Sequence, residues 1–288
     1  MIWHHLAGRL MQPAILVAGS LTAAALLPVP PALGDATPCD VPDELMQVDD
    51  KLPHLAERLR AGEPVKIVAI GGASTTGLAA GSSDLGYPHR LQEILARWYP
   101  TSPISVVNRG VPRQTAQQML ERFPSDVIAE NPVLVIWETG TTDAVRGVGV
   151  DDFAATLQAG IDQLKARSID IMLVDMQFSH STATVIDSAG YLNTLHRVGD
   201  INDVNVFPRF EMMRYWSEQK VFNFDGVAKD ERASLTASVY GCIGRKLAEA
   251  IRNRAPMIGS ADLTCLLSIF RFFHDFMIEI EAVAVVYL

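Results

Sequence analysis

The sequence has little cysteine, which limits both disulfide and metal chemistry. Its three cysteines, Cys39, Cys242 and Cys265, cannot all pair within one chain, so they allow one disulfide at most. Their spacing does not match that of a zinc site, and we expect no bound metal. Cys39 and Cys242 either form a bridge that ties the N-terminal end of the domain to a late helix, or remain two buried free thiols.

Positive charge is also scarce. Lys and Arg number 24 against 33 Asp and Glu, which gives a formal net charge of −9. Phosphate binding needs Lys and Arg clustered on one face, and the sequence contains no such cluster, so the composition argues against a nucleic-acid partner. The 288 residues, 49% of them hydrophobic, are enough for one sizeable α/β domain that binds a neutral or weakly polar ligand.

A long apolar run, Ala14 to Leu27, lies near the N-terminus and is shorter than the ~20 residues that a membrane-spanning helix needs. Arg9 gives a weakly basic start, and Ala32-Leu33-Gly34 offers small residues for cleavage. This layout favours a signal peptide over residues 1–34, with an uncleaved membrane anchor as the alternative. We therefore expect an exported protein, periplasmic or secreted, without an integral membrane span after cleavage.

Apolar β-rich runs alternate with segments of helical periodicity, a pattern typical of a parallel sheet covered on both faces. The expected strands are Lys66–Gly71, Ile104–Asn108, Val133–Glu138, Ile171–Asp175 and Val204–Phe207, and the expected helices are Tyr87–Trp98, Thr115–Glu130, Asp151–Ala166 and Tyr191–Val198. The predicted fold class is α/β: a doubly wound three-layer sandwich with a five-stranded parallel sheet over residues 35–254. Residues 255–288 form a C-terminal tail that is either a docked amphipathic segment or poorly ordered.

Ligands of such sheets bind beyond the carboxyl ends of the strands, so the segments after the strands are candidates for function. The first, Gly71–Gly77, follows a buried strand as a glycine-lined turn, the layout in which α/β hydrolytic enzymes mount a nucleophile. Ala73 occupies the position where that nucleophile is expected. The other candidate segments are Asn108–Thr115, Glu138–Gly147 and Asp225–Tyr240.

These segments resemble motif blocks of the SGNH (GDSL-like) hydrolases, and in particular a group of exported bacterial members. The matching runs, in order, are Cys39-Asp40-Val41-Pro42, Gly71-Gly72-Ala73-Ser74-Thr75, Val106-Val107-Asn108-Arg109-Gly110, Leu134-Val135-Ile136-Trp137-Glu138-Thr139-Gly140-Thr141 and Tyr240-Gly241-Cys242. The resemblance implies a flavodoxin-like fold and hydrolysis of esters in lipids, acetylated sugars or small acyl compounds, without metal or organic cofactor. It also implies a serine nucleophile, a late Asp-x-x-His, and an oxyanion hole that includes a glycine amide and an asparagine side chain.

The resemblance places other residues at each of these positions. The nucleophile falls on Ala73, the oxyanion glycine on Arg113 and the asparagine on Thr142. Counted back from Tyr240-Gly241-Cys242, the late acid falls on Glu231 and the base on Ser234; a second register, Asp225-Gly226-Val227-Ala228, puts alanine at the base position. We therefore predict a pseudoenzyme that binds a small-molecule, carbohydrate or acyl ligand in the old cleft, with Arg113 favouring an anion.

The alternative is a divergent serine esterase or acylhydrolase that uses Ser74 as its nucleophile. Successive residues on a turn point in different directions, so we expect the Ser74 hydroxyl to face away from the old base position. The remaining candidate bases are His89, His180 and His196, of which His180 lies at the functional edge. Glu138 and Asp143 also lie near this edge, where acidic residues commonly cap helices or pair with an arginine such as Arg146.

Overall fold

A parallel β-sheet organises the protein. The computed structural model describes residues 39–46, 52–180, 184, 186–224 and 226–255. The described strands form one five-stranded sheet in the order β2-β1-β3-β4-β5, and every neighbouring pair is parallel. Their bounds, each within two residues of the predicted strands, are β1 Val65–Gly71, β2 Ile104–Gly110, β3 Leu134–Glu138, β4 Asp170–Val174 and β5 Asn205–Phe207. The predicted α/β fold with five parallel strands is confirmed.

Both faces of the sheet are covered, which explains why its strands read as continuous apolar runs. In β3, Leu134 and Ile136 belong to one hydrophobic cluster, while Val135 and Trp137 belong to the other. All four side chains are completely buried. Alternating side chains of a strand point to opposite faces, so each strand contributes to two separate cores.

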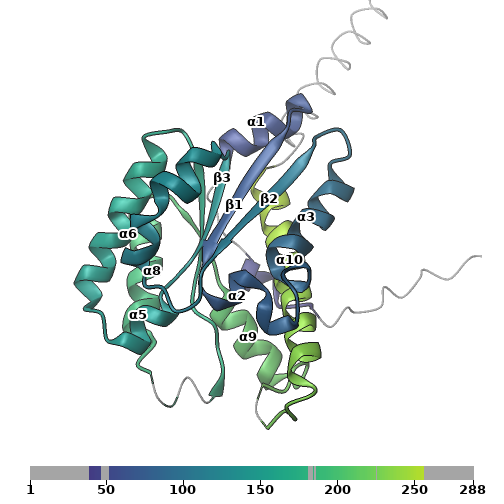
Figure 1. The fold of residues 1–288 in the computed structure, drawn as a ribbon, viewed down its shortest axis with the longest axis vertical. Coiled ribbons are helices and arrows are strands. Elements are labelled where there is room, and N and C mark those ends of the chain that lie inside the picture. Colours follow the sequence, from purple (N-terminus) through teal and green to yellow (C-terminus); the bar gives the residue numbers. More distant parts are fainter. Residues whose placement is uncertain (1–38, 47–51, 181–183, 185, 225, 256–288) are drawn as a thin grey trace, which may run out of the picture. The chain divides into compact units, whose positions relative to one another are not determined.

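The helices form the two outer layers (Figure 1). One core is closed by α1 Pro53–Ala61, α3 Tyr87–Trp98, α9 Arg209–Glu218 and α10 Arg232–Arg254; the other is closed by α4 Ala116–Glu121, α6 Val150–Lys165 and α8 Ala189–Ile201. Two short helices, α2 Ala73–Thr76 and α5 Thr141–Arg146, follow the carboxyl ends of β1 and β3. The predicted three-layer sandwich is therefore also confirmed.

One predicted helix is wrong. Thr115–Glu130 was expected to be continuous, but α4 ends at Glu121 and is followed by a wider π-helical turn, Phe123–Val127, and a 3₁₀ turn, Ile128–Glu130. Pro124 supplies the reason, because it has no N–H to donate to the preceding turn and its ring crowds the carbonyl four residues earlier. The N-terminus of α4 is well defined, since Thr115 and Gln118 form a reciprocal capping box.

A disulfide joins Cys39 to Cys242, across 203 positions of sequence. Of the two alternatives for these cysteines, a bridge or two free thiols, the structure has the bridge. It ties the segment before α1 to α10, and the Trp216 indole donates a hydrogen bond to the Asp40 carbonyl beside it. The predicted signal peptide, the third cysteine, Cys265, and the predicted tail beyond Ala255 lie outside the described residues. Within the described part of the chain, none of the helices combines the length and apolar character needed to cross a bilayer.

Candidate functional site

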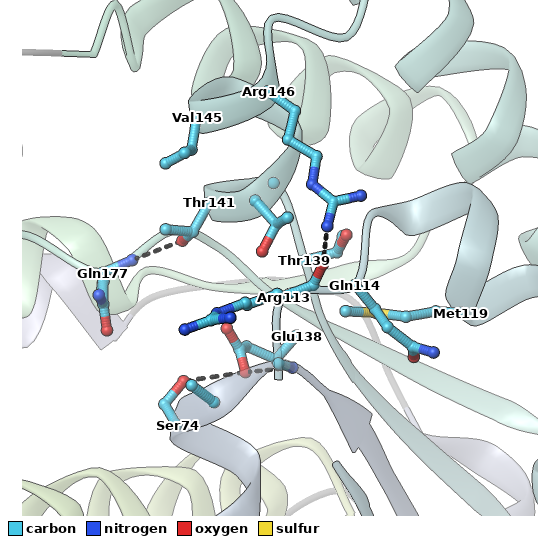
Figure 2. A pocket seen from close by; sticks show the side chains of 14 residues that line it. Ser74, Arg113, Gln114, Met119, Glu138, Thr139, Thr141, Val145, Arg146 and Gln177 are labelled. Carbon is cyan, nitrogen blue, oxygen red and sulfur yellow. Dashed lines mark hydrogen bonds between the residues drawn. The ribbon is translucent and has the colours of Figure 1, made fainter. Parts of the chain in front are cut away.

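The order of the strands determines where a ligand site is expected. β1 and β3 are neighbours, and the chain continues outward from them in opposite directions, to β2 and to β4. Ligands of open α/β sheets bind beyond the carboxyl ends of the strands at such a switch point. A cavity of about 320 Å³ opens there, between the turn after β1 and the turn after β3 (Figure 2). Its lining includes Ala73, Ser74, Arg113, Glu138, Thr142 and Arg146.

Close backbone packing explains the glycines around this turn. A Cβ at Gly71 would lie 2.1 Å from the Thr75 hydroxyl oxygen, and a Cβ at Gly110 would lie 2.7 Å from the backbone nitrogen of Thr76. Neither distance is possible without moving the turn after β1. These glycines therefore let the ends of β1 and β2 approach the helix that carries Ala73.

Ala73 and Ser74 have different surroundings although they are adjacent. Ala73 is exposed and presents only a methyl group to the cavity, so it offers nothing that can attack a carbonyl. Ser74 is buried, donates a hydrogen bond from Oγ to Glu138 Oε2 at 2.9 Å, and accepts one from Arg209 Nη1 at 2.9 Å. The hydroxyl of Ser74 is thus fixed from both sides within the protein.

A buried ion pair between Glu138 and Arg209 lies beneath the cavity. Arg209 Nη2 is 3.1 Å from Glu138 Oε1, and both side chains are almost completely buried. Glu138 Oε2 also accepts hydrogen bonds from the Gly72 amide and the Thr75 hydroxyl. Burial raises the pKa of Glu138, but the Arg209 charge and the hydrogen bonds outweigh it and leave this pKa below its usual value. Glu138 is therefore charged, holds the turn after β1 through its hydrogen bonds, and is a weak base.

One tyrosine, Tyr87, joins this buried network, and a second, Tyr240, is close enough to feel its charges. Thr75 gives its proton to Glu138, so the Tyr87 hydroxyl, 2.9 Å away, is the donor to Thr75. Burial and the nearby Glu138 charge raise the pKa of Tyr87 far above its normal value, and burial raises that of Tyr240 to about 12. Both phenols stay neutral across the physiological range.

Arg113 has an unusual backbone for a large residue. Its φ of 63° lies in the left-handed region that favours glycine, the residue that the family resemblance implies at this position. Its carbonyl accepts a hydrogen bond from Arg146 Nη2 at 2.8 Å. The Arg113 side chain points into the cavity (Figure 2), and its guanidinium has no hydrogen-bond or ion-pair partner among the described residues. Sparsely populated backbone conformations are often kept at functional sites.

The backbone of Arg113 leads to a stability prediction. We expect Arg113→Gly to unfold with a free energy about 1 kcal/mol higher than that of Arg113→Ala, because only the alanine keeps a Cβ in the left-handed conformation. Both variants lose the same charge, so each is the control for the other. Urea unfolding of the two proteins measures the difference. Equal stabilities would mean that the backbone relaxes at this position.

Two acidic residues near the edge have structural partners. Asp143 is buried and accepts the backbone N–H of Ala116 at 3.0 and 3.2 Å, so it caps the N-terminus of α4, and burial raises its pKa. Glu138 pairs with Arg209. The arginine suggested from the sequence, Arg146, instead contacts the Arg113 carbonyl and the Gln118 side chain. As the sequence suggested, one acid caps a helix and the other pairs with an arginine. The arginine that pairs with Glu138 is Arg209 and not Arg146.

The structure brings only some of the predicted site residues together. Ala73, Ser74, Arg113 and Thr142 line the cavity. Glu231 and Ser234, at the start of α10, are exposed and are not among its lining residues. In the second register, Asp225 lies outside the described residues and Ala228 is exposed.

No histidine is among the described residues that line this cavity. His89 lies on α3 beside Glu93, and the ring of His180 packs against Phe178. His196 Nε2 is 3.1 Å from Asp175 Oδ2, and this contact raises the pKa of His196. A serine hydroxyl needs a nearby base to become nucleophilic, and the group that accepts the Ser74 hydroxyl is the Glu138 carboxylate. Across the described residues, no group of His, Cys, Asp and Glu side chains is arranged to hold a metal ion.

Arg209 is the important site residue that the sequence did not reveal. It directly follows β5 and Pro208, and its only sequence signal is this position after the end of a strand. It contacts Glu138 across 71 positions and Ser74 across 135 positions of sequence. Such long-range pairing leaves no local pattern.

A family comparison covers most of the chain. The model of the non-GDSL lipase-like family matches residues 38–257. No curated protein sequence gives a significant match.

Solved structures with the same fold include several esterases. A two-domain esterase active on acetylated mannans, crystallised with mannopentaose, is 18% identical with a TM-score of 0.55; the match covers 72% of this chain and 56% of that one. A catalytic mutant of Axe2, an acetylxylan esterase from Geobacillus stearothermophilus, is 20% identical with a TM-score of 0.52, covering 67% and 94%. TesA is 17% identical with a TM-score of 0.50, covering 64% and 99%. At these identities the likeness concerns the fold.

Proposed function

Because the chain belongs to the non-GDSL lipase-like family, we propose that it is an SGNH-fold protein without ester-hydrolase activity. It binds a small acyl or carbohydrate ligand in the cavity at the carboxyl ends of β1 and β3. The observation that carries this proposal is the methyl group of Ala73 at the exposed position on the turn, beside a Ser74 hydroxyl that is held by Glu138 and Arg209.

Magnitudes support the loss of catalysis. Removing a catalytic serine or histidine typically lowers turnover by about 10⁶. Losing one oxyanion donor lowers it by about 10² to 10³. These penalties do not add, but the first alone leaves little hydrolysis. Thr142, at the asparagine position, has no amide group to donate and points the same way, whereas Arg113 keeps the backbone N–H of the glycine position.

The charges around the cavity favour an anionic ligand. Arg113 and Arg146 line the cavity and have no carboxylate partner within the described segments, and the lining carboxylate, Glu138, is already neutralised by Arg209. Guanidinium groups bind carboxylates and phosphates through charge-assisted hydrogen bonds. The cavity is therefore locally positive although the net charge of the whole chain is negative.

Export is part of the proposal. Residues 1–34 have the layout of a cleavable signal peptide, and the Cys39–Cys242 disulfide fits an oxidising compartment such as the periplasm or the extracellular space. The protein that binds the ligand would then start near Asp35 and carry the bridge intact.

An ester panel tests the proposal. We expect the purified, disulfide-intact protein to hydrolyse p-nitrophenyl acetate, p-nitrophenyl octanoate and acetylated xylo-oligosaccharides no faster than buffer, and Ser74→Ala to behave identically. Release of p-nitrophenol or acetate is the measurement. Clear turnover that Ser74→Ala abolishes would overturn the proposal.

A divergent serine esterase remains the second candidate, because Ser74 Oγ lies 2.9 Å from the Glu138 carboxylate. In that mechanism Glu138 would accept the serine proton. Its low pKa and its pairing with Arg209 make it a poor base. A serine-directed fluorophosphonate probe separates the two candidates: covalent labelling of the folded protein at Ser74 would support the esterase, and absence of labelling is expected.

A further inference from the structure

A second cavity adjoins the first. It has a volume of about 610 Å³ and lies between the turn after β1, the segment after β4 and the inner face of α10. The two cavities share three lining residues, Ala73, Ser74 and Gln177. The exposed methyl group of Ala73 is therefore common to both, at the place where one cavity meets the other.

The two cavities differ in the side chains that line them. The first presents Arg146 and the guanidinium of Arg113, which has no partner among the residues that the structure describes. The second has five large apolar side chains, Phe178, Met213, Phe224, Leu235 and Val239, beside polar ones such as Gln177, Thr236 and Tyr240. Arg232 is the one charged residue among its described lining residues. A ligand that fills both spaces needs a small anionic end and an apolar body.

The guanidinium contacts make Arg113 the better placed of the two arginines to hold the anionic end. Arg146 already donates from Nη2 to the Arg113 carbonyl and from Nη1 to Gln118, whereas the Arg113 guanidinium donates to none of the described residues. A planar guanidinium matches the two oxygens of one carboxylate in a bidentate arrangement. A carboxylate therefore fits this contact.

We propose that the site binds an unesterified acyl acid, with its carboxylate on Arg113 and its hydrocarbon chain passing over Ala73 into the second cavity. This inference rests on the proposed function, because a ligand that is retained intact requires that Ala73 does no chemistry at the junction. Arg113 stands where the family resemblance implies a glycine, so the carboxylate contact is a property of this chain.

Chain length gives a first quantitative expectation. Each buried methylene group contributes enough to tighten binding by about fourfold until the second cavity is filled. We therefore expect octanoate to bind at least about 30-fold more tightly than butyrate, since only octanoate reaches well beyond Ala73.

Isothermal titration calorimetry with octanoate, butyrate and octanol tests the inference on the disulfide-intact protein. Octanoate is expected to bind at least about 10-fold more tightly than octanol, which has the same chain without the charge. Arg113→Ala should lower the affinity for octanoate by about 10-fold or more and leave the affinity for octanol unchanged. Arg113→Lys should give an intermediate affinity for octanoate, because lysine keeps the charge but lacks the planar pair of N–H donors. Arg214→Ala, on the surface of α9 and outside both cavity linings, is the matched control and should change nothing.

Filling the second cavity tests the apolar half separately. Leu235→Trp should reduce the affinity for octanoate to about that for butyrate and leave butyrate unchanged, because only the longer chain needs this space. An unchanged circular dichroism spectrum and melting temperature confirm that each variant is folded.

The outcomes separate this inference from the proposed function. Equal binding of octanoate and octanol, no octanoate binding, or an unchanged affinity in Arg113→Ala overturns the acyl-acid ligand and leaves the absence of hydrolysis untouched. Hydrolysis of p-nitrophenyl octanoate that Ser74→Ala abolishes overturns the proposed function, and the acyl-acid ligand falls with it because that acid would then be a product.

Discussion

Replacing Arg209 with methionine is expected to lower the free energy of unfolding by about 3–5 kcal/mol, the usual cost of leaving a buried charge without its partner. Arg209 and Glu138 are 1% and 5% exposed, so water cannot replace the lost contact. The Ser74 hydroxyl also loses the donor at 2.9 Å. Methionine preserves much of the volume, which separates the effect of the charge from that of a cavity. Equilibrium unfolding in urea measures the change.

The stability that Arg209→Met loses should depend on pH, because the pKa of Glu138 changes in opposite directions in the two proteins. In the native protein the folded pKa of Glu138 is lowered, so its contribution to stability is present above the unfolded glutamate pKa of about 4.3 and is lost as the pH falls. In Arg209→Met burial dominates, and the folded pKa rises above the unfolded value. The variant then tolerates Glu138 better in its protonated form. The stability difference between the two proteins should be largest near about pH 7 and smaller near about pH 4.

A matched surface pair provides the control. Arg58 and Glu63 are 2.6 Å apart with about half of each side chain exposed, and Arg58→Met should cost less than about 1 kcal/mol. The double variant Glu138→Gln with Arg209→Met should be more stable than Arg209→Met alone, because it no longer carries an unpaired charge. A single Arg209→Met variant as stable as Arg58→Met would show that the buried pair does not hold this edge together.

The second large effect concerns the disulfide. Replacing Cys39 and Cys242 together by alanine is expected to lower the free energy of unfolding by about 2–5 kcal/mol. The bridge closes most of the domain into one loop, with 203 positions between the two cysteines, so its removal releases a large amount of chain entropy in the unfolded state. The segment around Asp40 also loses its covalent link to α10.

Reduction provides an independent check. A Cys265→Ala background removes the third thiol, so that no exchange of partners complicates the result. In this background a reductant should lower the melting temperature of the bridged protein and leave that of the alanine pair unchanged. A bridged protein that melts at the same temperature with and without reductant would contradict the prediction.

Much of the fold could be predicted from the sequence because burial on both faces produces continuous apolar strands. β3 was predicted to within one residue, and α3 with its observed ends, since an amphipathic helix repeats its apolar residues locally. The break after α4 was missed although Pro124 signals it. The glycine turn after β1 and its alanine were also readable, because close backbone packing requires glycine there.

The partners of the site residues could not be read in the same way. The sequence placed Glu138 at the edge but suggested Arg146 as a partner, whereas folding brings Arg209 to it from beyond β5. Glu231 and Ser234 are exposed at the start of α10 and are absent from the described linings of both cavities that include Ala73. Motif spacing alone does not show which residues of a helix line a cavity.

The sequence by itself therefore determined the sheet, the family and the absence of a serine at position 73. Only the tertiary structure decided that Ser74 is held by Glu138 and Arg209, that the Arg113 side chain has no partner in the described part of the chain, and that two cavities meet at Ala73. The physical reason is one of range. Strands and helices are encoded by the periodicity of neighbouring residues, while buried charges and cavities depend on side chains that meet across 60 to 140 positions of sequence, such as Ser74 with Glu138 at 64 and Ser74 with Arg209 at 135.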